Sequence, residues 1–229
     1  MTDTELVNHY NRLFEESIKE IEGGNYQIDS LIDSASDDRF GLTLLIRPSD
    51  NVKDEIQKFI GELKSMEPDQ YYYPYPDIHL TVISIITCYN GFKLENISVP
   101  NYIDLIKKSL ENKTSFEIDF NGVTASPSCV MIRGFASDGT LNLIRDDLRE
   151  RFARSNLQQS IDGRYRIQTA HSTVVRFSRR LSNKDKFLKI LDKYRNYNFG
   201  SFTAGTLELV YNDWYQRGDY VKTLCKFNI

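Results

Sequence analysis

The chain has 229 residues, of which 40% are hydrophobic and 27% are charged, a composition typical of a folded globular protein. Its net charge of −3 at pH 7 excludes a protein that coats long nucleic acids, because such coating needs a basic face that neutralises many phosphates. Recognition of a single nucleotide or of an RNA end remains open, since a few local groups suffice for it.

The N-terminus, the apolar runs and the cysteines indicate the cellular compartment of the protein. The first ten residues lack a basic stretch followed by an apolar one, so no signal peptide is expected, and the longest apolar runs are far too short to span a membrane. Cys88, Cys129 and Cys225 are odd in number and widely spaced, which favours free thiols in a reducing compartment. We therefore expect a cytoplasmic protein that neither enters a membrane nor depends on a disulfide.

The first 39 residues are predicted to be an extension ahead of the main fold. Apolar residues recur at helical spacing over residues 2–22, Gly23 and Gly24 end this pattern, and a polar stretch runs to Asp38. His9 lies on the predicted helix without any partner motif and is interpreted as a surface residue. Residues 40–229 are expected to form one domain.

Strands and helices then alternate along the chain. The pattern predicts strands over 40–48, 78–86, 115–123, 129–135, 165–177, 202–212 and 219–228, and helices over 50–66, 102–110, 140–154 and 183–194. Residues 71–77 cannot lie inside a helix, because they contain two prolines.

One internal repeat occurs within this domain. Its first unit is a strand ending in Leu-Ile-Arg, then Ser-Asp, a helix, and a strand that begins with the tetrapeptide HLTV at 79–82. The second unit is Met-Ile-Arg, Ser-Asp, a helix, and the tetrapeptide HSTV at 171–174. This order predicts two related lobes with pseudo-two-fold symmetry, whose histidine-bearing strands lie on opposite sides of a central groove.

Each tetrapeptide places an imidazole and a hydroxyl on one face of a strand. Alternate strand residues share a face, so His79 lies beside Thr81 and His171 beside Thr173, about 7 Å apart. Hydrolysis of a phosphodiester requires a base for the attacking oxygen and an acid for the leaving oxygen. Histidine can serve as either near neutral pH, and the threonine hydroxyls can donate to phosphate oxygens.

A single His-x-Thr is more often a packed core histidine than a catalytic one. Here, two of the chain's three histidines begin the same pattern at equivalent positions of a repeat, which favours the catalytic interpretation. The sequence contains no glycine-rich phosphate loop and no cluster of metal-ligand spacing, so neither a cofactor nor a metal is expected.

The doubled motif resembles the 2H phosphoesterases, in the branch described as bacterial 2′-5′ RNA ligase-like or cyclic phosphodiesterases. Segments 40–56, 123–135 and 202–221 also resemble this family, so the likeness covers about residues 40–229 in the family's order. It implies an α+β fold of two duplicated lobes, with two mostly antiparallel sheets around a central groove and the helices outside. It implies metal-independent hydrolysis of 2′,3′-cyclic or 2′-linked nucleotide or RNA-end phosphates, with His79 and His171 as acid and base and Thr81 and Thr173 as phosphate contacts.

Ser172 departs from the family's pattern, and the role of Arg176 stays open. Ser172 is polar where the family usually has an apolar residue. Arg176 lies where relatives often carry arginine, but regular alternation from His171 would place it on the opposite face of the strand.

Two tyrosines are further candidates for substrate contact. Tyr75 belongs to an aromatic run, Tyr71 to Tyr75, just before the first motif, and Tyr211 lies in a closing strand. Either could stack on a base, or simply pack on the protein.

Two alternative functions remain open: a non-catalytic module that binds a nucleotide or an RNA end, and an enzyme for a small non-nucleotide phosphodiester. The expected partner in the favoured interpretation is the substrate alone, and a monomer is expected.

Overall fold

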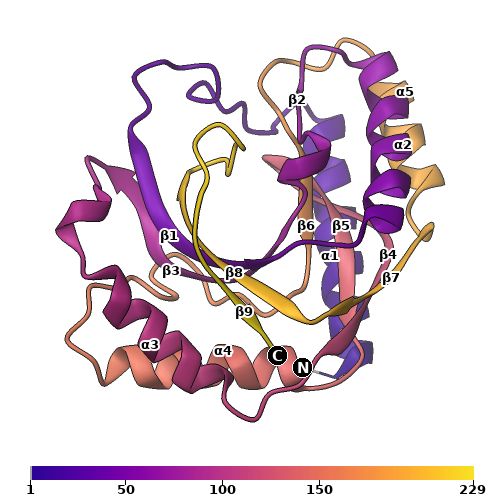
Figure 1. Ribbon diagram of the computed structural model, residues 1–229. Coiled ribbons are helices and arrows are strands. Elements are labelled where there is room, and N and C mark those ends of the chain that lie inside the picture. Colours follow the sequence, from indigo (N-terminus) through magenta and orange to yellow (C-terminus); the bar gives the residue numbers. More distant parts are fainter. Residues whose placement is uncertain (1) are drawn as a thin grey trace.

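Two curved antiparallel sheets form the centre of the computed structural model, which describes residues 2–229 (Figure 1). The first sheet has the order β3 (Leu80–Asn90), β1 (Arg39–Ile46), β8 (Thr206–Asp213) and β9 (Lys222–Asn228). The second has the order β2 (Tyr71–Tyr72), β6 (Ser172–Arg176), β5 (Cys129–Ala136), β4 (Phe116–Ser126) and β7 (Asn198–Ala204). The helices are α1 (Asp3–Glu22), α2 (Asp50–Met66), α3 (Val99–Leu110), α4 (Thr140–Ala153) and α5 (Lys184–Lys193), with 3-10 turns at Tyr75–Asp77 and Leu94–Asn96.

The strand orders confirm the predicted duplication and the α+β fold of two antiparallel sheets. In the first sheet β1 lies between β3, which follows the first motif histidine, and β8, which in turn pairs with β9. In the second sheet β5 lies between β6, which follows the second histidine, and β4, which pairs with β7. The two four-strand arrangements are therefore equivalent, and β2 is an additional strand beside β6.

The helices cross between the two halves. Helix α2 connects β1 to β3 of the first sheet but packs against β7, β6 and α5, on the side of the second sheet (Figure 1). Helix α4 connects β5 to β6 of the second sheet but packs against α3 and β3, on the side of the first. Neither half can therefore complete its core without a helix from the other.

Two of the predicted strands differ in the structure. The predicted strand 202–212 is interrupted at Gly205, so that its first part is the end of β7 in the second sheet and its second part is β8 in the first. An uninterrupted apolar pattern does not reveal that the chain changes sheets. The predicted strand 165–177 is reduced to β6, because residues 165–171 pair with no neighbouring strand.

Helix α1 packs against β4, and its Phe14 and Ile21 belong to the hydrophobic core. The Thr2 hydroxyl caps its first turn, and Glu5 completes the capping box. Tyr10 is 1% exposed, and its hydroxyl donates to the Gly134 carbonyl of β5 at 3.2 Å. Ser17 donates to the Ala125 carbonyl of β4 at 2.9 Å. These contacts fix the helix to the second sheet.

A buried arginine joins the two halves at the motifs themselves. Arg145 of α4 is completely buried, and its Nε donates to the Val82 carbonyl at 2.8 Å. Its Nη2 donates to the carbonyls of Thr81, at 3.2 Å, and Thr169, at 2.8 Å. Burial lowers the pKa of Arg145 to about 10, so the guanidinium stays charged at neutral pH. Charged residues are frequent in the sequence of α4, so the sequence alone does not distinguish Arg145 from the other arginines of this helix.

Replacing Arg145 by methionine is expected to destabilise the protein by at least about 3 kcal/mol, because three buried carbonyls lose a charged donor. The measurement is urea unfolding at pH 7. Arg154→Met, at an exposed arginine that pairs with Glu150, is the control and should change the stability by less than about 0.5 kcal/mol. Equal effects of the two substitutions would show that Arg145 does not join the halves energetically.

Candidate active site

Both His-x-Thr motifs contain a β-bulge at the same place. In the pairing of β1 with β3, Leu44 lies opposite Ile83 and Leu45 opposite Thr81, so that Val82 is an extra residue. In the pairing of β5 with β6, Val130 lies opposite Val175 and Met131 opposite Thr173, so that Val174 is the extra residue. The valine of each tetrapeptide is thus the bulged residue, which interrupts the alternation of side chains.

The bulge corrects the expected position of Arg176. Because Val174 takes one additional step, Arg176 returns to the face that carries Thr173, and both line one cavity with His171. The expectation that regular alternation turns it to the opposite face is therefore wrong. Its counterpart in the first motif is Ser84, which lines a second cavity together with Thr81.

The carbonyl oxygen of each bulged valine accepts a hydrogen bond from a group that does not belong to the paired strand, β1 or β5. Val82 accepts from Arg145, and Val174 accepts from the backbone N–H of Tyr73 at 3.1 Å. A bulge removes a residue from the strand ladder, so these two donors stabilise the local geometry that places the motif residues.

His79 is 8% exposed and is held by the residue two positions before it. Its Nδ1 lies 2.7 Å from the Asp77 carbonyl. A carbonyl only accepts, so the neutral ring carries its proton on Nδ1 and leaves Nε2 as an acceptor. Burial lowers the pKa of His79 to about 4, and the charges of Arg47, Arg176 and His171 act in the same direction.

His171 is also held by the residue two positions before it, but by a side chain. Its Nδ1 lies 2.7 Å from the Thr169 hydroxyl, which can donate or accept. Burial lowers the pKa of His171 to about 4, with further lowering by the charges of Arg145 and Arg176. Both imidazoles are therefore neutral in the free protein at pH 7. The equal spacing of Asp77 and Thr169 before the histidines is a signal that sequence reasoning missed.

A chain of contacts leads from one motif to the other. Arg176 Nε donates to the Tyr73 hydroxyl at 2.9 Å, and the Tyr73 ring lies edge-on to His79 with 6.1 Å between the ring centroids. Tyr73 is 1% exposed, so this member of the aromatic run packs inside the protein. The charges of Arg176 and His171 both lower the pKa of His79, so groups of the second motif act electrostatically on the histidine of the first.

Two adjoining cavities contain the threonines of the motifs. His171, Thr173 and Arg176 line a cavity of about 560 Å³, and Thr81 lines a smaller one of about 80 Å³. Arg164 and Tyr165 line both cavities, so the segment between α4 and β6 forms a wall that they share. A single groove that holds all four motif side chains stays a prediction.

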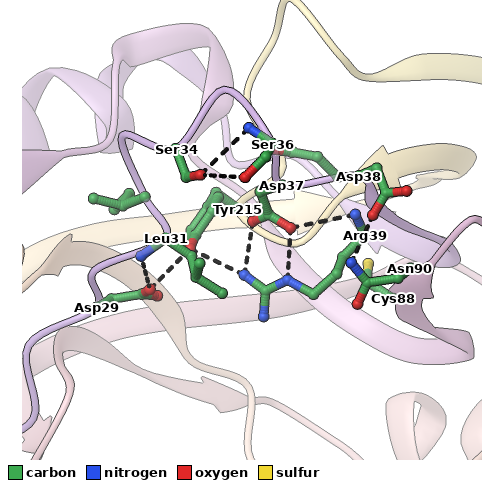
Figure 2. A network of polar contacts seen from close by, with 12 residues as sticks. Asp29, Leu31, Ser34, Ser36, Asp37, Asp38, Arg39, Cys88, Asn90 and Tyr215 are labelled. Atoms are coloured by element: carbon green, nitrogen blue, oxygen red, sulfur yellow. Dashed lines mark hydrogen bonds and ion pairs between the residues drawn. The ribbon is translucent and has the colours of Figure 1, made fainter.

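The linker between α1 and β1 connects the second sheet to the end of β8. The backbone N–H of Asp29 donates to the Phe177 carbonyl, and its carboxylate accepts from the Tyr215 hydroxyl at 2.9 Å. Tyr215 in turn accepts from Arg39, which makes two 2.7 Å contacts with the Asp37 carboxylate (Figure 2). This network holds the linker and the segment after β8 together.

The remaining sequence candidates lie in other surroundings. Tyr75 contacts the Asp50 carbonyl and lines a separate depression with Arg47 and Lys53. The Tyr211 ring stacks on Phe40 at 4.9 Å, and its hydroxyl donates to the Phe92 carbonyl. Neither lines the cavity of His171.

Ser172 is completely buried behind His171, and its hydroxyl lacks a hydrogen-bond partner among the described residues. A buried hydroxyl without a partner destabilises the fold, which explains why an apolar residue suits this position.

His9 is not a simple surface residue. It is half-buried and lines the same cavity as His171, which corrects the interpretation from the sequence. Helix α1 therefore takes part in the surroundings of the second motif. Only the folded chain shows this, because the two histidines are 162 positions apart in sequence.

The described residues, 2–229, contain neither a metal-binding cluster nor a membrane-spanning helix. No group of three or more His, Cys, Asp or Glu side chains is arranged to bind a metal ion. In the same part of the chain, none of the helices has the length and apolar character needed to cross a membrane.

The fold resembles that of several solved structures. E. coli LigT complexed with 3′-AMP superposes with a TM-score of 0.57 at 13% identity, over 83% of this chain and 98% of LigT. TT0787 of Thermus thermophilus gives a TM-score of 0.56 at 16% identity, over 82% of this chain and 97% of the other. The conserved protein ATU0111 of unknown function from Agrobacterium tumefaciens gives 0.57 at 13% identity, over 91% and 97%.

No protein-family model matches the sequence, and no curated protein matches it significantly. At these identities the comparisons concern the fold, which is the LigT-like α+β fold that the resemblance to 2H phosphoesterases predicted.

The lowered histidine pKa values predict a loss of stability in acid. The unfolded chain binds protons at its histidines near pH 6.5, whereas His79 and His171 in the folded protein bind them only near pH 4. The free energy of unfolding should therefore fall as the pH drops from 6.5 towards 4, by roughly 1.4 kcal/mol per pH unit for each histidine.

Urea unfolding at several pH values measures this fall in the free energy of unfolding. The carboxylates of the protein also titrate in this range, but they contribute equally to the wild type and to a histidine variant, so the difference between the two reports the histidine. His171→Asn should show a shallower fall than the wild type between pH 6.5 and 4. An identical slope in the variant would mean that the His171 pKa is not lowered.

Proposed function

We propose that this chain is a metal-independent phosphodiesterase that hydrolyses 2′,3′-cyclic or 2′-linked nucleotide or RNA-end phosphates. The observation that carries the proposal is the matched local geometry of the two motifs. Each histidine is held through Nδ1 by the residue two positions before it, and each is followed by a threonine and a bulged valine. Packing alone does not require this detail twice.

The proposed reaction uses one neutral and one protonated histidine. The neutral imidazole accepts a proton from water at Nε2 while the water oxygen attacks phosphorus. The bond from phosphorus to the leaving oxygen breaks, and the protonated imidazole gives its proton to that oxygen. Thr81 and Thr173 donate to the non-bridging oxygens, and Arg176 stabilises their negative charge.

Both histidines are neutral in the free protein, so one must gain a proton before the reaction. A bound phosphodiester anion next to an imidazole raises its pKa, because it stabilises the charged form. The substrate would thus produce the acid form that it needs. The rate should follow a bell-shaped pH profile, in which the substrate complex titrates closer to neutrality than the free enzyme.

The structural neighbours support this assignment. The E. coli LigT structures were solved with 3′-AMP, phosphate, ATP and NADP+, and another neighbour is described as a phosphoesterase. A cytoplasmic monomer that acts on nucleotides remains part of the proposal. The two alternatives are a binding module without turnover and an enzyme for non-nucleotide phosphodiesters. An assay of 2′,3′-cyclic mononucleotides, with the 2′- and 3′-phosphate products resolved, tests the proposed function, and a panel of non-nucleotide phosphodiesters then distinguishes the two alternatives.

His79→Ala and His171→Ala should each reduce turnover of the cleaved nucleotide by about 100-fold to 10,000-fold, the usual contribution of a positioned acid or base. The double variant should be little worse than either single one, because the two groups act as a unit. Thr81→Val and Thr173→Val should cost less and affect KM as well as kcat. Arg154→Gln on the surface is the control. Near wild-type turnover in both histidine variants would exclude the two-histidine mechanism.

Activity is expected to survive exhaustive treatment with a chelator, because imidazoles rather than a metal ion supply the proton transfers. The measurement is turnover of a 2′,3′-cyclic nucleotide before and after dialysis against EDTA. Turnover that disappears with the chelator and returns with a divalent cation would overturn this part of the proposal.

A further inference from the structure

The cavity of His171 is lined by several basic side chains, although the protein as a whole is acidic. Its walls include three arginines and two histidines but, among the described residues, no aspartate or glutamate: Arg164, Arg166, Arg176, His9 and His171. The whole chain has a net charge of −3, so this concentration of basic side chains, with the positive charge of its arginines, is local. Such a cavity favours an anionic ligand.

The basic side chains belong to two regions of the cavity wall. Arg176 and His171 belong to the second motif, where the reacting phosphate would bind. Arg164 and Arg166 come from the segment between α4 and β6. Arg166 is paired with Asp146 at 3.0 Å, whereas Arg164 has no salt bridge to a carboxylate in the described part of the chain. The Arg164 guanidinium lies 4.3 Å from the centre of the Trp214 ring, which leaves its hydrogen-bond donors for a ligand.

His9 offers a further donor from helix α1. Arg12 Nη2 lies 3.4 Å from His9 Nδ1, and a guanidinium only donates, so Nδ1 accepts and the neutral ring carries its proton on Nε2. The contacts of Tyr10 and Ser17 with β5 and β4 hold the helix in place. His9 is therefore a positioned donor in the cavity wall.

The negative charge of a single phosphodiester does not neutralise all the positive charge available in this cavity. A phosphodiester carries one negative charge, which Arg176 and one protonated histidine of the motifs already neutralise. The cavity, at about 560 Å³, lies within the size range of sites that bind small molecules and cofactors, so it has room beyond one phosphate group. Additional negative charge on the ligand would satisfy Arg164.

We propose that Arg164 and His9 form a second anion subsite, so that the substrate is a nucleotide phosphodiester that carries an additional phosphate. The proposal rests on the proposed function in one respect, namely that the reacting phosphate lies at His171 and Thr173. Arg164 donates to the oxygens of the additional phosphate, and His9 donates to it through Nε2. Helix α1 is then a specificity element of the active site.

The test compares the binding of two ligands, adenosine 2′-monophosphate and adenosine 2′,5′-bisphosphate. Neither contains a cyclic phosphate, so the proposed reaction does not consume them. Isothermal titration calorimetry should show that the wild type binds the bisphosphate at least about tenfold more tightly. Arg164→Gln and His9→Ala should each reduce this ratio towards one. Arg164→Lys and His9→Gln, which keep a donor, should restore part of it.

Arg154→Gln, which removes an arginine outside the cavity, should leave the ratio unchanged, and urea unfolding checks that each variant is folded. Equal binding of the two ligands by the wild type, or an unchanged ratio in a folded Arg164→Gln variant, would overturn the subsite. Failure of the wild type to bind the bisphosphate at millimolar concentration would do the same.

Turnover of 2′,3′-cyclic AMP is measured separately, so the two proposals can fail independently. A preference for the bisphosphate without any cleavage of cyclic phosphates would support the subsite and exclude the proposed reaction. Cleavage without the preference would exclude the subsite and leave the reaction in place.

Discussion

The buried guanidinium of Arg145 is the constraint on which the arrangement of the two motifs depends. It donates to the carbonyls of Thr81 and Val82 in the first half and of Thr169 in the second. A charge buried without a carboxylate partner is tolerated only where carbonyl oxygens surround it. The two halves therefore cannot separate locally without taking carbonyl acceptors away from this buried charge and its charged donor away from those carbonyls.

The two bulges have a consequence for chemistry as well as for the fold. A regular strand would place the residue five positions after each histidine on the far face. The extra valine brings Arg176 back beside Thr173 in one half and Ser84 beside Thr81 in the other. The same local geometry thus yields a cationic position in the second half and a neutral one in the first. The arginine that follows the motif is therefore found beside His171 and not beside His79, although the two motifs are alike.

Helix α1 and the irregular segment before β6 shape the surroundings of His171. Helix α1 contributes His9 and Tyr10, and the irregular segment before β6 contributes Arg164 and Tyr165 to the same cavity. The linker from α1 to β1 is held by Tyr215 and Arg39 through two carboxylates (Figure 2). The superposition on E. coli LigT covers 83% of this chain, so about a sixth of the chain lies outside the superposed part. The shared fold therefore leaves room for specificity particular to this protein.

The sequence by itself determined the α+β fold, the internal repeat and the two His-x-Thr motifs, because helical and strand periodicity and short motifs are local properties of the chain. Only the tertiary structure decided that residues 202–212 divide between two sheets at Gly205. It alone also decided that Arg176 shares a strand face with Thr173, and that His9 lines the cavity of His171. Each of these depends on how strands pair or on which distant element covers a face. A bulge shifts the alternation by one residue without changing the composition of the strand, and the buried role of Arg145 arises only when carbonyls from both halves surround it. Pairing partners and neighbours that are distant in sequence are set by the packing of the whole molecule, so no local pattern contains them.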